Sequence, residues 1–116
     1  MPMEKPEWKE VGGPDSWNIP PGEFTVFGTV WVWPEHAEHV NILYSKITSV
    51  ALADPGTVYY CISRDQDDPA VFHFFERYQD RASFDAHNEH PLVKELLASG
   101  WTKDIKAVFA KAVEGQ

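Results

Sequence analysis

The chain has 116 residues, 43% of them hydrophobic and 14% aromatic, which is enough for one packed domain and excludes a wholly disordered chain. Eighteen acidic and ten basic residues give a net charge of −8 at pH 7. This charge argues against a nucleic-acid backbone or an anionic membrane as partner, because both are bound through positive charge. Five Trp, four Tyr and seven Phe are many aromatic residues for one small acidic domain.

The single cysteine, Cys61, rules out an internal disulfide and lies in an apolar run typical of a buried strand. Secreted chains of this size more often carry paired cysteines, and residues 1–21 lack the apolar segment of a signal peptide. No apolar stretch is long enough to cross a membrane as a helix. We therefore expect a cytoplasmic protein with neither a membrane nor a nucleic acid as partner.

Residues 1–22 predict an N-terminal arm, and residues 23–113 predict the folded domain. Prolines and glycines recur through the arm and prevent regular secondary structure there. The arm also carries Trp8 and Trp17. We expect these side chains to dock on the domain or on a neighbouring subunit, because leaving large apolar groups in water is costly.

The first predicted strand is Phe24–Trp33, which is rich in β-branched and aromatic residues and stops before Pro34. In Glu35–Ala53, apolar residues recur at spacings of three and four, the pattern of a helix with one buried face. Two further strands, Thr57–Arg64 and Ala70–Tyr78, flank a polar turn and predict an antiparallel hairpin.

The last part of the chain predicts two short helices and one more strand. Asp80 is a suitable N-cap for a helix through Ala86, and His90-Pro91 opens another helix through Ala98. The segment Asp104–Val113 fits either a strand or a helix, and we favour the strand. The resulting βαββαβ order predicts an α+β, ferredoxin-like fold, with a four-stranded antiparallel sheet and helices on one face.

Both faces of the predicted sheet carry apolar side chains. In the first strand, Phe24 and Val26 lie on one face, while Phe27, Trp31 and Trp33 lie on the other. The helices can cover only one face, so a second layer must cover the other. A second copy of the chain is the simplest such layer and gives a homodimeric α/β barrel. The alternative is that the N-terminal arm alone folds over this face.

An ordered set of short motifs follows: Asp54-Pro55-Gly56, then Tyr60, Asp68-Pro69, Phe74-Phe75-Glu76-Arg77-Tyr78, and Phe84-Asp85-Ala86-His87 with Pro91 four residues on. With these motifs, residues 24–100 resemble the antibiotic biosynthesis monooxygenase (ABM) domain of small dimeric α/β-barrel proteins such as quinol monooxygenases. Tyr78 stands where the family often has tryptophan, and Leu92 stands where many members have a second histidine.

His87 is the leading catalytic candidate, because an imidazole exchanges a proton near pH 7. Glu76, on the preceding strand, is placed to accept a hydrogen bond from His87 and fix its tautomer. The alternative is that this pair only ties the helix to the sheet. The proposed lining of a flat apolar cavity for an aromatic substrate is Tyr60, Tyr78, Phe74, Trp31 and His73. For His73, a core position and a position in the second layer both remain open.

The resemblance implies oxygenation of a small electron-rich aromatic, a quinol or a polyketide-like phenol, by dioxygen without metal, flavin or other cofactor. It also implies a homodimer with His87 as the base, Glu76 as its orienter, and Tyr60 or Tyr78 as a donor to the substrate oxygen. One alternative is a non-catalytic ligand-binding or dimerisation module of the same fold. A haem-degrading or isomerase-like enzyme is a further alternative, which we rank last.

Overall fold

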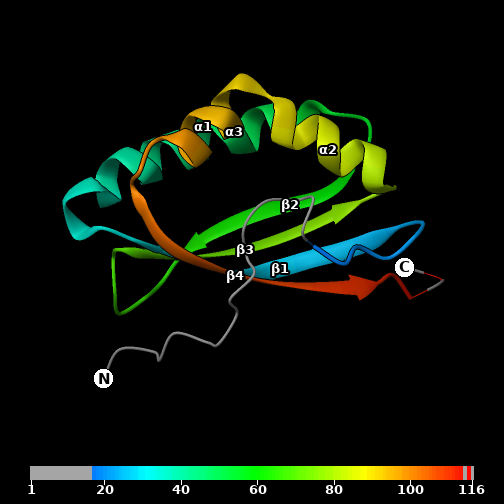
Figure 1. The fold of residues 1–116 in the computed structure, drawn as a ribbon, viewed down its shortest axis with the longest axis horizontal. Coiled ribbons are helices and arrows are strands. Elements are labelled where there is room, and N and C mark those ends of the chain that lie inside the picture. The colour runs from blue at the N-terminus through cyan, green and yellow to red at the C-terminus, as the bar shows by residue number, and fades with distance from the viewer. Residues whose placement is uncertain (1–16, 114, 116) are drawn as a thin grey trace.

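The computed structural model describes residues 17–113 and 115, which form a four-stranded antiparallel sheet with its helices on one face (Figure 1). The elements in chain order are β1 (Phe24–Val32), the 3₁₀ turn η2 (Pro34–His36), α1 (Ala37–Ala53), β2 (Thr57–Arg64), β3 (Val71–Tyr78), α2 (Arg81–Glu89), α3 (Pro91–Ala98) and β4 (Thr102–Lys111). The strand order in the sheet is β2-β3-β1-β4. This arrangement confirms the predicted ferredoxin-like fold.

Two element boundaries differ from the predicted ones. Helix α2 continues to Glu89 instead of ending at Ala86, and it stops only at His90, which is extended because Pro91 follows. The Asp80 side chain caps the start of α2 by accepting a hydrogen bond from the Ser83 amide at 2.8 Å, as expected. The last segment is a strand, β4, which pairs with β1 along its length.

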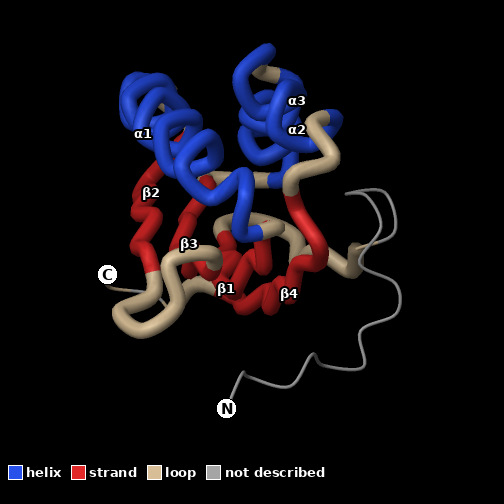
Figure 2. The backbone as a smooth tube through the Cα atoms, turned by 90° about the vertical axis from the view of Figure 1, so that its left-hand side faces the viewer, coloured by secondary structure: helices blue, strands red, loops and turns tan. Residues whose placement is uncertain are grey.

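The hydrophobic core lies between the helices and one face of the sheet. Figure 2 shows these two layers, with the helices on one side of the sheet. On β1, Phe24 and Val26 face the helices, and Phe72 and Phe74 do so on the neighbouring β3. Gly28 lies on the same face of β1. A Cβ atom there would collide with the carbonyl oxygen of Lys106 on β4 and lie 3.0 Å from the Phe74 ring. Glycine therefore allows both the pairing of β1 with β4 and the close packing of Phe74.

The other face of the sheet carries an apolar row that runs across all four strands. This outer row is Cys61, Phe75, Phe27 and Val108, which are consecutive neighbours in the strand register. Phe27 is 37% exposed and Phe75 is 43% exposed. The helices thus cover one apolar face of the sheet and leave the outer row open in the single chain.

The segment before β1 docks on the domain through Trp17. The Trp17 ring packs against Phe84 of α2, with centroids 6.0 Å apart, and against Phe109 of β4, at 5.3 Å. Docking of Trp17 on the domain is therefore confirmed, while Trp8 lies outside the described residues. In the part of the chain that the structure describes, we find no helix with the length and apolar character needed to span a membrane.

Candidate functional site

A cavity of about 90 Å³ lies between the helix-facing side of the sheet and the helices. Most of its lining is hydrocarbon, with Phe74 from β3 and Ala107 from β4 at the sheet and Val93 from α3 at the helices. The lining residues that carry polar atoms are Trp17, Tyr44, Tyr60, Glu76, His87 and Asn88. A largely apolar cavity with a few polar groups is the usual form of a small-molecule site.

Glu76 is the one carboxylate in this cavity lining. It lies on the helix-facing side of β3, next to Tyr60 of β2 in the strand register. Its carboxylate accepts a hydrogen bond from the Tyr78 hydroxyl at 2.5 Å. Burial raises the pKa of Glu76 from 4.5 to about 7, while the hydrogen bond from Tyr78 acts in the opposite direction. Near neutral pH this side chain can therefore both hold and release a proton.

His87 projects from α2 toward the sheet and is 7% exposed. Its ring packs against Tyr60, with centroids 5.1 Å apart, and against Tyr78, at 5.6 Å. Burial lowers the pKa of His87 to about 4, with a smaller opposing effect of the Asp54 charge. The imidazole is therefore neutral at pH 7.

The expected hydrogen bond from His87 to Glu76 is not formed among the described residues. Glu76 and Tyr78 are two residues apart on one strand and so point to the same face, which brings the Tyr78 hydroxyl to the carboxylate. His87 packs against the ring of Tyr78 instead. The structure thus brings Glu76, His87, Tyr60 and Tyr78 together, but with the tyrosine as the hydrogen-bond partner of the acid.

The tyrosines around the site remain protonated at neutral pH. Burial raises the pKa of Tyr44, Tyr60 and Tyr78 in each case, and the nearby Glu76 charge raises them further. Tyr44 and Tyr60 line the cavity, whereas Tyr78 uses its hydroxyl on Glu76. Phenol groups in this state are hydrogen-bond donors to an oxygen in the cavity.

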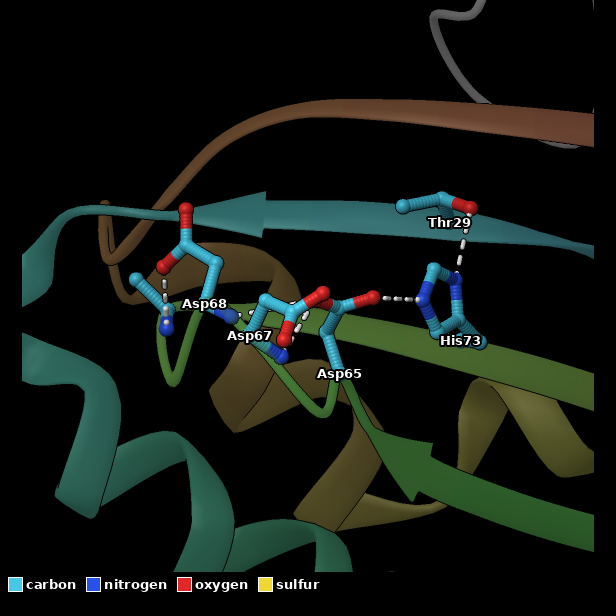
Figure 3. A network of polar contacts seen from close by, with 6 residues as sticks. Thr29, Asp65, Asp67, Asp68 and His73 are labelled. Atoms are coloured by element: carbon cyan, nitrogen blue, oxygen red, sulfur yellow. Dashed lines mark hydrogen bonds and ion pairs between the residues drawn. The ribbon is translucent and has the colours of Figure 1, made fainter. Parts of the chain in front are cut away.

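Trp31 and His73, two of the predicted substrate contacts, are not brought to this cavity. Trp31 lies on the outer side of β1, two residues from Thr29. Figure 3 shows His73 between Asp65 and Thr29, with its Nε2 atom 2.7 Å from an Asp65 oxygen and its Nδ1 atom 3.0 Å from the Thr29 hydroxyl. The hydrogen bond with His73 and two turn amides hold the pKa of Asp65 below its usual range. This network fixes the β2–β3 turn to the outer side of the sheet.

Trp17, Tyr44 and Asn88 line the cavity, although the sequence patterns did not single them out as site residues. Tyr44 had a signal, because it belongs to the apolar spacing of the first helix. Asn88 had no signal in the sequence beyond its place next to His87, because its position at the cavity depends on how α2 packs on the sheet. Among the described residues, no group of three or more His, Cys, Asp or Glu side chains is placed to hold a metal ion.

Residues 23–99 match the family model described as antibiotic biosynthesis monooxygenase. A crystal structure of an antibiotic biosynthesis monooxygenase is 28% identical to this chain with a TM-score of 0.69, and the match covers 78% of this chain and 98% of that one. A protein from Pseudomonas aeruginosa is similar at 18% identity and a TM-score of 0.72, covering 79% and 95%. A conserved protein from Methanosarcina mazei is similar at 20% identity and a TM-score of 0.67, covering 79% and 94%. No protein with a curated description matches.

Proposed function

This chain belongs to the antibiotic biosynthesis monooxygenase family, and from that premise we propose that it oxygenates a small electron-rich aromatic with dioxygen. The substrate class is a quinol or a polyketide-like phenol, and the proposed location is the cytoplasm, which the single Cys61 supports. The observation that carries the proposal is a partly buried Glu76, with a pKa of about 7, as the one carboxylate in the lining of a largely apolar cavity.

The proposed reaction starts with removal of a hydroxyl proton from the substrate. The resulting electron-rich phenolate reacts with dioxygen: one oxygen atom becomes a new ring hydroxyl and the other leaves as water. In both substrate classes the substrate supplies all four electrons, two for the ring hydroxylation and two when the hydroxylated ring becomes a quinone. The protein then has to supply a base, donors for the substrate oxygens and exclusion of water.

We assign the base to Glu76 and not to His87, which was the expectation from the sequence. A general base works best when its pKa lies near the working pH, and the pKa of Glu76 is about 7 while that of His87 is about 4. Tyr78 orients the carboxylate through its hydrogen bond. His87 forms part of the wall as a neutral ring, and Tyr60 is the proposed donor to the substrate oxygen.

Oxygen uptake with methylhydroquinone tests this function, using labelled dioxygen to follow the oxygen atoms. We expect enzyme-dependent uptake of one dioxygen per quinol, with label in the hydroxyquinone product and in water, above the rate without protein. Binding of the quinol with no uptake above that rate would instead support the alternative, a non-catalytic ligand-binding module of the same fold.

We also propose that two copies of the chain form a homodimer through the outer faces of their sheets. The outer row gives the physical reason, because its two phenylalanines remain substantially exposed in the single chain. Two such faces packed on each other would cover this apolar surface and close the sheets toward a barrel.

The Phe75→Glu variant is expected to elute at the mass of one chain, where the wild-type protein elutes at the mass of two. A charge at the centre of the outer row would be buried without a partner in the dimer but would remain in water in the monomer. Size-exclusion chromatography with light scattering measures this. The matched control is Ile42→Glu, an equally drastic change at a 54% exposed position on α1, which should leave the dimer intact. A wild-type protein that elutes as one chain at micromolar concentration would contradict the dimer.

A further inference from the structure

Two histidines at the start of α1 bring one ring nitrogen each to the same place. His36 is the N-cap residue of α1, and His39 follows three residues later in its first turn. Their Nδ1 atoms are 3.4 Å apart. His36 is half-buried and His39 is exposed, so dissolved ions can reach the pair. Neither residue lines the cavity described above, so the pair has no part in the proposed oxygenation.

Trp101, which lies just before β4, packs on both imidazole rings. Its indole stacks on His36, with ring centroids 5.7 Å apart and planes 24° apart, and it contacts the His39 ring at 5.2 Å. The backbone joins the same residues through Trp33. The Trp33 amide donates to the Trp101 carbonyl oxygen, and the Trp33 carbonyl oxygen accepts from the His36 amide, each at 2.9 Å. Both imidazoles are therefore held in place before an ion arrives, which lowers the entropy cost of binding it.

The distance between the two nitrogens matches that between two ligands of a tetrahedral metal ion. With Zn–N bonds of about 2.0–2.1 Å, two tetrahedral ligands lie about 3.3–3.4 Å apart. Ligands at a right angle around copper or nickel would lie only about 2.9 Å apart. We propose that His36 and His39 bind one Zn²⁺ through their Nδ1 atoms. This site goes beyond the proposed function and does not depend on it.

Zinc binding changes where the hydrogen atoms of the two rings lie. Without an ion, a hydrogen bond between the Nδ1 atoms needs a hydrogen on one of them. A zinc ion needs the lone pairs of both Nδ1 atoms, so this hydrogen has to move to Nε2 of the same ring. Both imidazoles stay neutral in this exchange of tautomers.

The charges around the pair favour a cation. A helix N-terminus carries a partial positive charge, which by itself disfavours a cation there. Glu35 and Glu38 lie in the first turns of η2 and α1 and oppose this charge. The chain as a whole carries a net charge of −8 at pH 7, which attracts cations. Because no group of three His, Cys, Asp or Glu side chains is placed to hold a metal among the described residues, water completes the coordination of the zinc.

Calorimetric titration of the full chain with zinc chloride, in a buffer that does not bind zinc, tests this inference. We expect saturable binding of one ion by the histidine pair of each chain. His36→Gln and His39→Gln should each lower the affinity at least about tenfold, because one imidazole cannot replace a preorganised pair. The matched control is His90→Asn, which removes a histidine elsewhere. Asparagine can take over its role at the N-cap of α3, and this variant should bind zinc like the wild type.

Nitrogen-15 spectra of the imidazole rings separate this site from zinc held by surface carboxylates. We expect zinc to place the hydrogen of both His36 and His39 on Nε2 and to leave His90 unchanged. The inference is overturned if the wild-type protein shows no saturable binding up to about 1 mM zinc, which corresponds to a binding free energy of only about −4 kcal/mol. It is equally overturned if both glutamine variants bind zinc like the wild type, or if zinc binds without changing the His36 and His39 rings.

Discussion

The Glu76→Gln variant is expected to oxygenate quinols about 10²–10⁴-fold more slowly than the wild-type protein, because the substitution removes the proposed base. Gln keeps the size of the side chain and can still accept a hydrogen bond from Tyr78, so the loss should fall on turnover and not on folding. Initial rates of oxygen uptake measure the effect. The wild-type rate should rise with pH around a midpoint near 7, as the carboxylate ionises.

His87→Phe is the variant that separates Glu76 from His87 as the base. Phenylalanine preserves the ring packing against Tyr60 and Tyr78 but has no basic nitrogen. We expect a much smaller loss of turnover than in Glu76→Gln, with the midpoint near pH 7 retained. A rate that survives in Glu76→Gln and is lost in His87→Phe would return the role of base to the histidine.

The dependence of folding stability on pH gives a second large effect, in which Glu76 and His87 oppose each other. The folded-state pKa of Glu76 is raised, so its contribution to stability is full below pH 4.5 and is lost as the pH rises to about 7. The folded-state pKa of His87 is lowered, so its contribution is full above pH 6.5 and is lost as the pH falls to about 4. Each change is worth about 3 kcal/mol in the free energy of unfolding.

In the wild-type protein the effects of Glu76 and His87 on the free energy of unfolding cancel between pH 4.5 and 6.5. A variant that lacks one of the two side chains should show the effect of the other. Stability should fall with rising pH in His87→Phe and rise with pH in Glu76→Gln, each relative to the wild type over this range. Urea unfolding at a series of pH values measures both. Other carboxylates contribute equally to all three proteins and drop out of the differences. A difference between wild type and Glu76→Gln that does not vary with pH would contradict the burial of this carboxylate.

Much of the fold could be predicted from the sequence, because alternation along strands and the three-four spacing of the first helix are local patterns. The same alternation placed Glu76 and Phe74 on one face with Tyr78, which is how part of the site could be anticipated. Trp31 shows that aromatic character alone does not predict which residues line the cavity. Its aromatic character suggested a cavity wall, although it alternates with the core residues of β1 and lies on the other side of the sheet.

The remaining features depend on packing between distant segments. Asn88 and Trp17 reach the cavity only because α2 and the segment before β1 settle against the sheet. The choice of Tyr78 over His87 as the partner of Glu76 depends on distances of a few ångströms between side chains. The pKa values that separate the two candidate bases arise from burial, which a sequence pattern does not measure.

Gly28 bears on how this scaffold could acquire a different ligand during evolution. Every other amino acid at this position would push against the Lys106 carbonyl and the Phe74 ring, and so would disturb the seam between β1 and β4. The strand pairing beside the lining residue Phe74 therefore does not tolerate gradual change at this point. Other parts of the cavity lining can vary without disturbing the strand pairing. These are the segment of Trp17 and the position of Asn88 on α2. New ligand specificities on this scaffold would accordingly arise through changes in the segment of Trp17 and in α2, while the pairing of β1 with β4 stays the same.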